Sequence, residues 1–326
     1  MAAKTLVVSR IVASVQHMSG GSETNHRVAF VTCAEFPDGH VDDLPAVAPL
    51  ADLGVDVTFA VWDDRSVDWS AFDLVVLRST WDYPPRLDEF LEWAESIPNL
   101  RNSYEAVRWS SDKRYLATLA AAGAPIIPTT FVEPGTDATD IVEAVLAMAA
   151  TADDFVVKPS VGAGSMGAGR FQSDDPNSVE QAIKHIGSLL EGDRAAMIQP
   201  YLNAIDVAGE TALIYMSGEF SHAIRKEPML AGGLAEFDGL FGDERPSPVE
   251  PTTAQRATAE AVFAAIPFDQ TELLYTRVDL LPGVNGTPLL LELELVEPSL
   301  FMDGMPEAGE RFAAAVAGAV AGRADR

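Results

Sequence analysis

Residues 155–170 read Phe155-Val-Val-Lys158-Pro-Ser-Val-Gly162-Ala-Gly164-Ser-Met-Gly167-Ala-Gly169-Arg170, an apolar strand that ends on a lysine and continues into a loop of small residues. Such a loop lets backbone N–H groups come close to an anion, because glycine has no Cβ in the way. Lys158 adds a positive charge beside the loop in a chain whose net charge is −27. The segment therefore predicts an anion site, with phosphate as the first candidate ligand and a flexible surface loop as the alternative.

The spacing Gly162-x-Gly164-x-x-Gly167 also matches the dinucleotide-binding fingerprint, which requires a helix that opens directly from the glycines. Here the breaker cluster Ser173-Asp-Asp-Pro-Asn177 follows, so a helix is expected only over residues 178–190. Strand, glycine loop and short strand indicate instead a hairpin flap over phosphates, as in the glycine-rich loop of kinases. No Gly-Lys-Ser/Thr sequence is present, which excludes a P-loop.

Two apolar strands joined by a turn are expected within residues 274–296. Side chains alternate across a strand, so Arg277 and Asp279 share one face, and Glu292 and Glu294 share one face of their own strand. Carboxylates inside an apolar run are expensive to bury alone, and a cation explains them economically. Magnesium prefers one or two carboxylates together with substrate phosphates. An edge strand with solvated acids is the alternative.

Together these features resemble the ATP-grasp ligases, a superfamily that includes D-alanine–D-alanine ligase, over roughly residues 100–300. The segments that carry the resemblance are the lysine helix and its exit at 111–128, Val157-Lys158-Pro159 with the glycine loop, Ile198-Gln-Pro-Tyr-Leu202, and Arg277-x-Asp279 with Glu292-x-Glu294. The family commonly has Asn where this chain has Glu294. That departure leaves open whether Glu294 or Glu297 completes the metal shell.

The resemblance implies a role for each matching residue. The residues expected to bind ATP are Lys113, Lys158, Gly162, Gly164, Ser165, Met166, Gly167, Gln199, Tyr201, Leu202, Glu210 and Lys226. A magnesium ion, with Mn²⁺ as an alternative, is expected on Asp279, Glu292 and Glu294. Arg277 is the expected catalytic residue, a fixed cation that stabilises the oxyanion of acyl transfer.

The same resemblance implies an α/β fold in which two lobes clamp ATP. The expected organisation is a disordered leader at 1–26, an open parallel α/β domain at 27–110, a central lobe at 111–198 and a C-terminal lobe with the metal site at 199–326. Alternating strand and helix signals up to about residue 108 independently favour the open parallel sheet.

A further loop, Leu77-Arg78-Ser-Thr-Trp81-Asp82-Tyr83-Pro84, follows a strand at the place where open α/β sheets bind ligands. Arg78, Trp81, Asp82 and Tyr83 suit an amino-acid-like substrate, and the alternative is that the aromatic rings only pack the domain edge. With this loop the chain is similar to the O-ureido-serine cyclo-ligases of D-cycloserine biosynthesis.

The expected reaction is ATP-dependent activation of a substrate carboxylate as an acylphosphate, followed by attack of an amine-type nitrogen. In a cyclo-ligase both groups belong to one molecule, so proximity supplies part of the acceleration. An intermolecular amino-acid ligase of the D-alanine–D-alanine type is the first alternative. A non-catalytic nucleotide-binding module is the second, against which the set with Arg277 speaks.

Composition limits the partners and the compartment. A chain of 326 residues with 48% hydrophobic and 22% charged residues is typical of an ordered globular enzyme. Its acidity disfavours nucleic acid and anionic membranes, and no stretch approaches the length of a membrane span. A single cysteine, Cys33, excludes an internal disulfide and suits the cytoplasm. The expected partner is a small amino-acid-like substrate, and a homodimer is left open.

Overall fold

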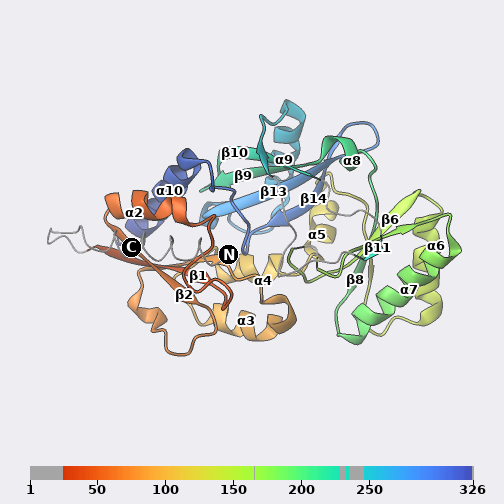
Figure 1. The fold of residues 1–326 in the computed structure, drawn as a ribbon, viewed down its shortest axis with the longest axis horizontal. Helices are drawn as coiled ribbons and strands as arrows, with labels where there is room; N and C mark the ends of the chain where they lie inside the picture. The colour runs from red at the N-terminus through yellow and green to blue at the C-terminus, as the bar shows by residue number, and fades with distance from the viewer. Residues whose placement is uncertain (1–24, 165, 228–232, 235–245, 325–326) are drawn as a thin grey trace, which may run out of the picture.

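The computed structural model describes residues 25–164, 166–227, 233–234 and 246–324, and these form three β-sheets with helices around them. Figure 1 shows the N-terminal sheet at one end of the molecule, the central lobe at the other and the C-terminal sheet between and above them. The mixed α/β class expected from the sequence is therefore confirmed. The domain boundaries given above stay predictions, and residues 1–24 of the expected leader lie outside the described part.

The first sheet is parallel, in the order β2-β1-β3-β4, as the alternating pattern predicts. The elements of this region are β1 (His26–Thr32), η1 (Leu44–Ala46), α2 (Val47–Asp52), β2 (Val55–Val61), η2 (Trp69–Ala71), β3 (Leu74–Ser79), η3 (Pro84–Arg86), α3 (Leu87–Glu95) and β4 (Leu100–Arg101). Every residue of β3 is buried, because the strand lies inside the sheet and is covered on both faces. Residues 80–84 follow the carboxyl end of β3 and lie between the lobes.

The central lobe carries the glycine loop on an antiparallel sheet, in the order β11-β7-β6-β8-β5. In chain order, the elements between β4 and the third sheet are α4 (Tyr104–Ser110), α5 (Tyr115–Ala121), β5 (Thr130–Val132), α6 (Ala138–Ala149), β6 (Asp154–Pro159), β7 (Gly169–Gln172), α7 (Pro176–Glu191) and β8 (Ala196–Pro200), and β11 (Gly233–Leu234) joins the central sheet from further along the chain. Because β6 and β7 pair antiparallel on either side of the glycines, the expected hairpin is confirmed and the dinucleotide turn is excluded, while its position over phosphates stays a prediction.

The third sheet has the order β12-β10-β9-β13-β14. The remaining elements are α8 (Ile205–Ala208), β9 (Glu210–Met216), β10 (Glu219–Lys226), β12 (Ser247–Pro248), α9 (Thr253–Ala265), η4 (Gln270–Glu272), β13 (Tyr275–Pro282), β14 (Pro288–Glu294) and α10 (Pro306–Ala324). The expected hairpin at residues 274–296 is confirmed, and its register pairs Arg277 with Glu294 and Asp279 with Glu292. Residues from both strands therefore meet at one point of the sheet.

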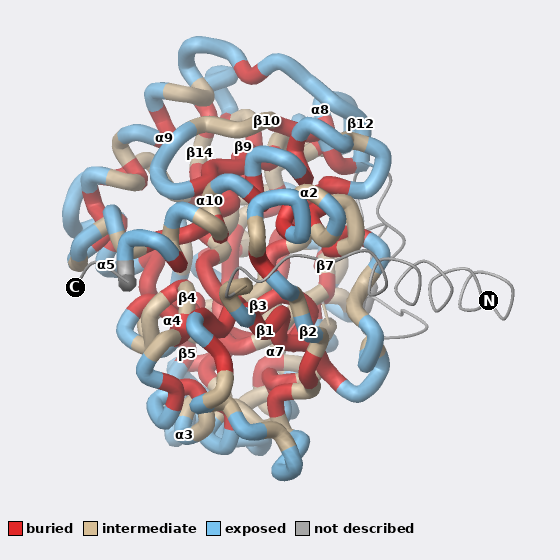
Figure 2. The backbone as a smooth tube through the Cα atoms, turned by 90° about the vertical axis from the view of Figure 1, so that its left-hand side faces the viewer, coloured by how far each residue is buried: buried red, intermediate tan, exposed pale blue. Residues whose placement is uncertain are grey.

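A shared core fastens the N-terminal sheet to the C-terminal part of the chain. Phe30 of β1 packs against Phe312 of α10, whose ring also lies near Tyr275 of β13. Figure 2 shows buried residues along β1, β3, β9 and β14, whereas the outer turns of the helices are exposed. This packing holds the end of β3 close to the end of β14.

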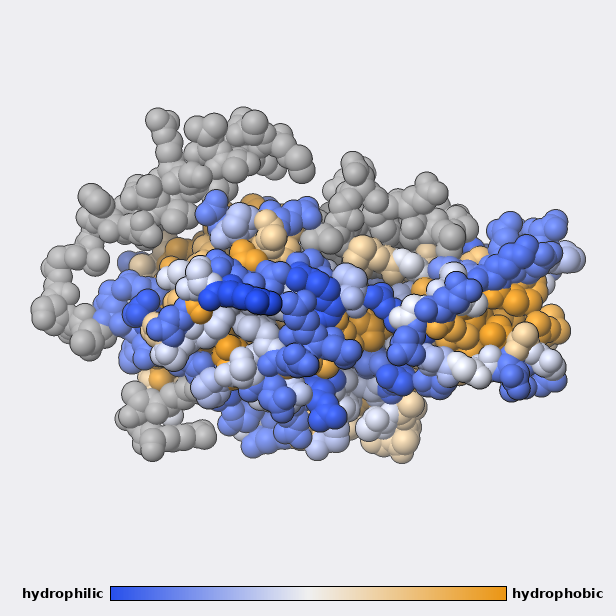
Figure 3. Space-filling model, turned by 90° about the horizontal axis from the view of Figure 1, so that it is seen from below, coloured by the Kyte–Doolittle hydropathy of each residue, from blue (hydrophilic) through white to orange (hydrophobic). Residues whose placement is uncertain are grey.

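The outer surface agrees with the composition. In Figure 3 hydrophilic residues cover most of the face seen from below, and hydrophobic residues gather at the end that carries the central lobe. Within the described part of the chain, no helix has both the length and the apolar character that a membrane crossing requires.

Candidate active site

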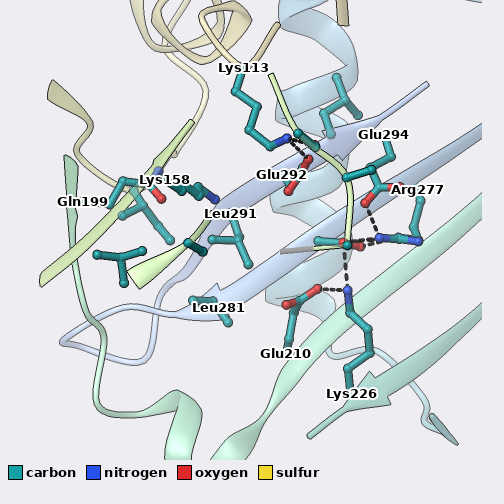
Figure 4. A pocket seen from close by; sticks show the side chains of 18 of the residues that line it. Lys113, Lys158, Gln199, Glu210, Lys226, Arg277, Leu281, Leu291, Glu292 and Glu294 are labelled. Carbon is teal, nitrogen blue, oxygen red and sulfur yellow. Dashed lines mark hydrogen bonds and ion pairs between the residues drawn. The ribbon is translucent and has the colours of Figure 1, made fainter. Parts of the chain in front are cut away.

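A cavity of about 210 Å³ lies where the three sheets meet. Its walls come from the glycine loop, from β6 and β8 of the central lobe, from β13 and β14, and from the loop after β3. Figure 4 shows basic and acidic side chains pointing toward one another from these elements. The cavity therefore collects charged groups from segments up to 184 residues apart in the sequence, from Lys113 to Glu297.

The glycine loop has the backbone that the sequence implies. Gly164 and Gly167 adopt φ angles of 59° and 74°, in the left-handed region that glycine enters without a Cβ clash. Both line the cavity, as do Gly162 and Met166. Ser165, also expected to bind ATP, lies outside the described residues.

Lys113 connects the glycine loop with the acidic hairpin. Its Nζ donates to the carbonyl oxygen of Gly162 at 2.6 Å and lies 3.0 Å from Oε1 of Glu292. Burial opposes the ionisation of Glu292, but Lys113 and Lys158 outweigh it and lower the pKa of that carboxyl. Lysine and glutamate are therefore both charged, and the flap is tied to β14 through them.

Lys158 lines the cavity from the end of β6 and sits beside Gln199 in Figure 4. Burial lowers the pKa of its ammonium group, although Glu292 partly compensates. A desolvated ammonium group is stabilised by an incoming anion, because the anion restores the charge compensation that burial removes. Lys158 therefore lines the cavity as a desolvated cation, and its contact with phosphate stays a prediction.

Arg277 spreads its guanidinium over two carboxylates. Its Nε lies 2.9 Å from Oδ1 of Asp279, its Nη2 lies 2.9 Å from Oδ2, and Nη2 also pairs with Glu294. Lys226 of β10 approaches the same Asp279 at 3.1 Å and pairs with Glu210 of β9. The network alternates positive and negative groups across the sheet, as Figure 4 shows.

Burial divides the three acids of this network, Asp279, Glu210 and Glu294, into two kinds. Burial also disfavours the charge on Asp279, but Arg277 and Lys226 hold its pKa below the ordinary value. Burial raises the pKa of Glu210 to about 8 and that of Glu294 to about 7. Asp279 is therefore a permanent anion, whereas Glu210 and Glu294 gain from any further cation that enters the cavity.

The donor set fits a hard cation that shares its shell with phosphates. Asp279, Glu292 and Glu294 supply only carboxylate oxygens, the ligands that Mg²⁺ prefers, and all three line the cavity. No His, Cys, Asp or Glu group of three or more in the described residues is close enough to hold a metal by itself. Such a site needs oxygen ligands from a bound nucleotide, as expected for Mg²⁺ in phosphoryl-transfer enzymes.

The far end of the cavity is apolar and suits a flat ring. Tyr201 and Leu202 line it after β8, as the sequence predicts, and Gln199 is fixed by its side-chain bond to Thr129 at 2.8 Å. Leu281 and Leu291, which Figure 4 shows below Lys158 on the side of Glu210, add an apolar surface from β13 and β14. Sequence reasoning missed these two leucines, because nothing in an apolar strand marks which residues face a ligand.

The four residues expected to bind substrate divide into two pairs. Trp81 and Tyr83 line the cavity, whereas Arg78 and Asp82 are not among the described residues that do so. Asp82 accepts from Nε1 of Trp62 at 2.8 Å and pairs with Arg86.

Arg78 lies in the interior instead. Its side chain is almost fully buried, its Nε lies 2.7 Å from Asp43, and Nη2 donates to the carbonyl oxygen of Pro298. Its guanidinium also lies over the rings of Tyr275 and Phe312. Arg78 thus joins β3 to the segment after β14, and its contacts are structural.

Comparisons with known proteins place the chain in one family. A sequence profile described as the N-terminal domain of D-cycloserine synthetase DcsG matches residues 28–102. The cycloserine biosynthesis protein DcsG of Streptomyces lavendulae is 38% identical over 295 residues, which is 89% of this chain and 97% of that protein. The chain belongs to the DcsG family of ATP-grasp ligases.

Solved structures share the fold of this DcsG family chain. The crystal structure of D-cycloserine synthetase DcsG superposes with a TM-score of 0.80 at 37% identity, over 90% of this chain and 99% of that one. D-alanine–D-alanine ligase from Bacillus anthracis, solved with ATP, superposes with a TM-score of 0.63 at 15% identity, over 92% and 99% of the two chains. The second likeness shows the ATP-grasp fold alone.

The family gives the cavity its general chemistry. As a member of the DcsG family, the protein is an enzyme, an ATP-grasp ligase that uses ATP. The resemblance inferred from the lysines, the glycine loop and the acidic hairpin is thereby confirmed.

Proposed function

We propose that this ligase activates the carboxylate of an O-ureido-serine-type substrate with ATP and closes it into a ring with release of phosphate. Hydrolysis of the carbamoyl group on the ring nitrogen, to carbon dioxide and ammonia, then leaves cycloserine. The single observation that carries the proposal is the position of Arg277, whose guanidinium pairs with both Asp279 and Glu294 in the cavity. The same guanidinium donates to the backbone at Ser299, two residues beyond Glu297, whose carbonyl oxygen accepts from Trp81. The 38% identity to a cycloserine biosynthesis protein supports the choice of substrate.

ATP binding is assigned to the central lobe and the sheet facing it. The adenine ring is held between the apolar surfaces of Leu281 and Leu291 and the segment of Gln199 to Leu202. Lys113, Lys158 and the N–H groups of the glycine loop neutralise the phosphates. Lys226 and Glu210 complete the nucleotide side of the cavity. Because burial raises the pKa of Glu210, its carboxyl group gains from a hydrogen bond with a ribose hydroxyl or from a nearby cation.

Magnesium is assigned to Asp279, Glu292 and Glu294, with Mn²⁺ as the alternative ion. When bound, the metal supplies positive charge to the β- and γ-phosphates and favours transfer of the γ-phosphoryl group. These three carboxylates hold that position while Lys113 and Arg277 balance their charge from either side.

Arg277 is assigned to the second chemical step. Attack of the substrate nitrogen on the acylphosphate produces a tetrahedral oxyanion, which a fixed guanidinium stabilises because the charge develops only in the transition state. Asp279 and Ser299 hold Arg277 in one orientation through Nε, Nη1 and Nη2. The nitrogen belongs to the same molecule, so no second substrate has to be bound.

A steady-state assay of ADP release with O-ureido-D-serine as the sole amino acid tests the proposal. We expect saturable ADP release that is absent in the Glu292→Gln variant and unchanged in Glu250→Gln, a surface acid paired with Arg256. ADP release only with two amino acids would establish the intermolecular ligase instead. Tight ATP binding without any turnover would favour a nucleotide-binding module.

A further inference from the structure

Glu297 is a cavity carboxylate to which the steps above assign no role. It lies three residues beyond the end of β14 and lines the cavity with Arg277 and Ser299. The other acids here have basic partners, Glu292 in Lys113 and Glu294 in Arg277. Within the described residues, no Lys, Arg or His nitrogen lies within 4.0 Å of the Glu297 carboxylate.

The loop after β3 fixes Glu297 from the opposite side. Nε1 of Trp81 donates to the backbone carbonyl oxygen of Glu297 at 2.9 Å. Tyr83 also lines the cavity, and burial first and the charge of Glu297 second raise the pKa of its hydroxyl. The Tyr83 ring stacks on Phe90 at 4.7 Å, so the hydroxyl is rigidly placed.

We propose that Glu297, oriented by Tyr83, binds the α-ammonium group of the substrate. The proposal rests on the proposed function, because it supposes an amino-acid substrate. An amino acid carries its ammonium and carboxylate on one carbon, so their binding groups must be neighbours. Arg277 and Glu297 meet this requirement, since Nη1 of Arg277 donates at 3.2 Å to the carbonyl oxygen of Ser299, two residues beyond Glu297.

Energetics favours an ammonium ligand at this place. A carboxylate in a closed cavity without a counter-ion is costly, and a cation that enters beside it recovers that cost. Burial and the neighbouring Glu294 raise the pKa of Glu297 to about 8, so the charged carboxylate is disfavoured until a cation lies beside it. An ammonium group brings that charge and donates hydrogen bonds to the carboxylate.

The test compares O-ureido-D-serine with 3-(ureidooxy)propanoate, which lacks the α-amino group, in the wild-type enzyme and in Glu297→Gln. We expect Glu297→Gln to raise KM for the amino substrate about 10- to 100-fold, as for removal of one partner of a buried charge pair, and to change KM for the desamino compound less than about threefold. Tyr83→Phe should raise the same KM by about 3- to 10-fold, the effect of one hydrogen bond. Glu250→Gln is the surface control.

Two readouts separate this role from others. The magnesium and ATP concentrations at half-maximal rate should be unchanged in Glu297→Gln; a large rise in the magnesium requirement would make Glu297 a metal ligand and overturn the proposal. Rises in KM of equal size for O-ureido-D-serine and for the desamino compound, in Glu297→Gln and in Tyr83→Phe, would overturn it as well. If the wild type releases no ADP with O-ureido-D-serine, the proposed function fails. The ammonium site is then tested by comparing KM for D-alanine with KM for propionate in the wild-type enzyme and in Glu297→Gln.

Discussion

Replacement of Arg277 by lysine separates charge from geometry at the reacting centre. Arg277 uses three nitrogens, with Nε and Nη2 on Asp279 and Nη1 on the carbonyl oxygen of Ser299 at 3.2 Å. Lysine keeps the positive charge but has one nitrogen on a flexible stem. It can retain the contact with Asp279 or offer its charge to the oxyanion, but it cannot keep both in fixed positions.

The expected losses follow from this count. Loss of one oxyanion donor lowers kcat by about 100- to 1,000-fold, or about 3–4 kcal/mol. Loss of a charge-assisted hydrogen bond to Asp279 lowers the free energy of unfolding by about 1.5–3 kcal/mol, which leaves a folded enzyme. ATP affinity should change by less than about threefold, because the retained charge still balances the cavity acids.

Calorimetric ATP binding, ADP release and urea unfolding measure these three quantities on one preparation. Arg256→Lys is the matched control, because Arg256 pairs with Glu250 on the surface and should show no change in any of them. A variant with near-normal kcat would refute the oxyanion role. An equal loss of ATP affinity and kcat would place Arg277 on the nucleotide instead.

Three other substitutions test the remaining assignments. Lys158→Ala should weaken ATP binding more than about tenfold, the effect of a lost phosphate contact, and unchanged affinity by calorimetry would remove the flap from the ATP site. Asp279→Asn and Glu292→Gln should abolish turnover while circular dichroism shows a native fold, and near-normal rates at low magnesium would make the pair structural. Arg78→Met should leave Asp43 buried without a partner and lower the free energy of unfolding by about 3–5 kcal/mol. Because burial already raises the pKa of Asp43, this loss of stability should be largest at neutral pH and should shrink as the pH falls and the carboxyl takes up a proton. Unchanged stability together with a raised KM for the substrate would instead assign Arg78 to the substrate site.

The local features of the fold could be predicted because their physical causes are local. Residues 173–175 separate β7 from α7, which begins at Pro176 rather than at the expected residue 178, so the glycine loop closes a hairpin instead of opening a helix. Alternation along two neighbouring strands places Arg277, Asp279, Glu292 and Glu294 on one hairpin, and the register brings them together. The confirmed expectations thus rest on spacing within a few residues.

Arg78 shows what local pattern does not contain. An arginine at the carboxyl end of a buried strand points either to the ligand crevice or into the interior, and the choice depends on a partner elsewhere. Here Asp43 supplies that partner from 35 residues away, and Pro298 from 220 residues away. Leu281 and Leu291 are the opposite case, since only the packing of the central lobe turns them into cavity walls.

Transfer of oxygen from substrate to phosphate tests carboxylate activation most directly. O-ureido-D-serine labelled with ¹⁸O in its carboxylate is supplied as the sole amino acid with ATP and magnesium, and the released phosphate is examined by ³¹P NMR. Formation of an acylphosphate followed by ring closure predicts one ¹⁸O in each phosphate, with a rate that follows a single saturation curve in the substrate. Unlabelled phosphate, or labelled phosphate only after a second amino acid is added, would contradict intramolecular carboxylate activation.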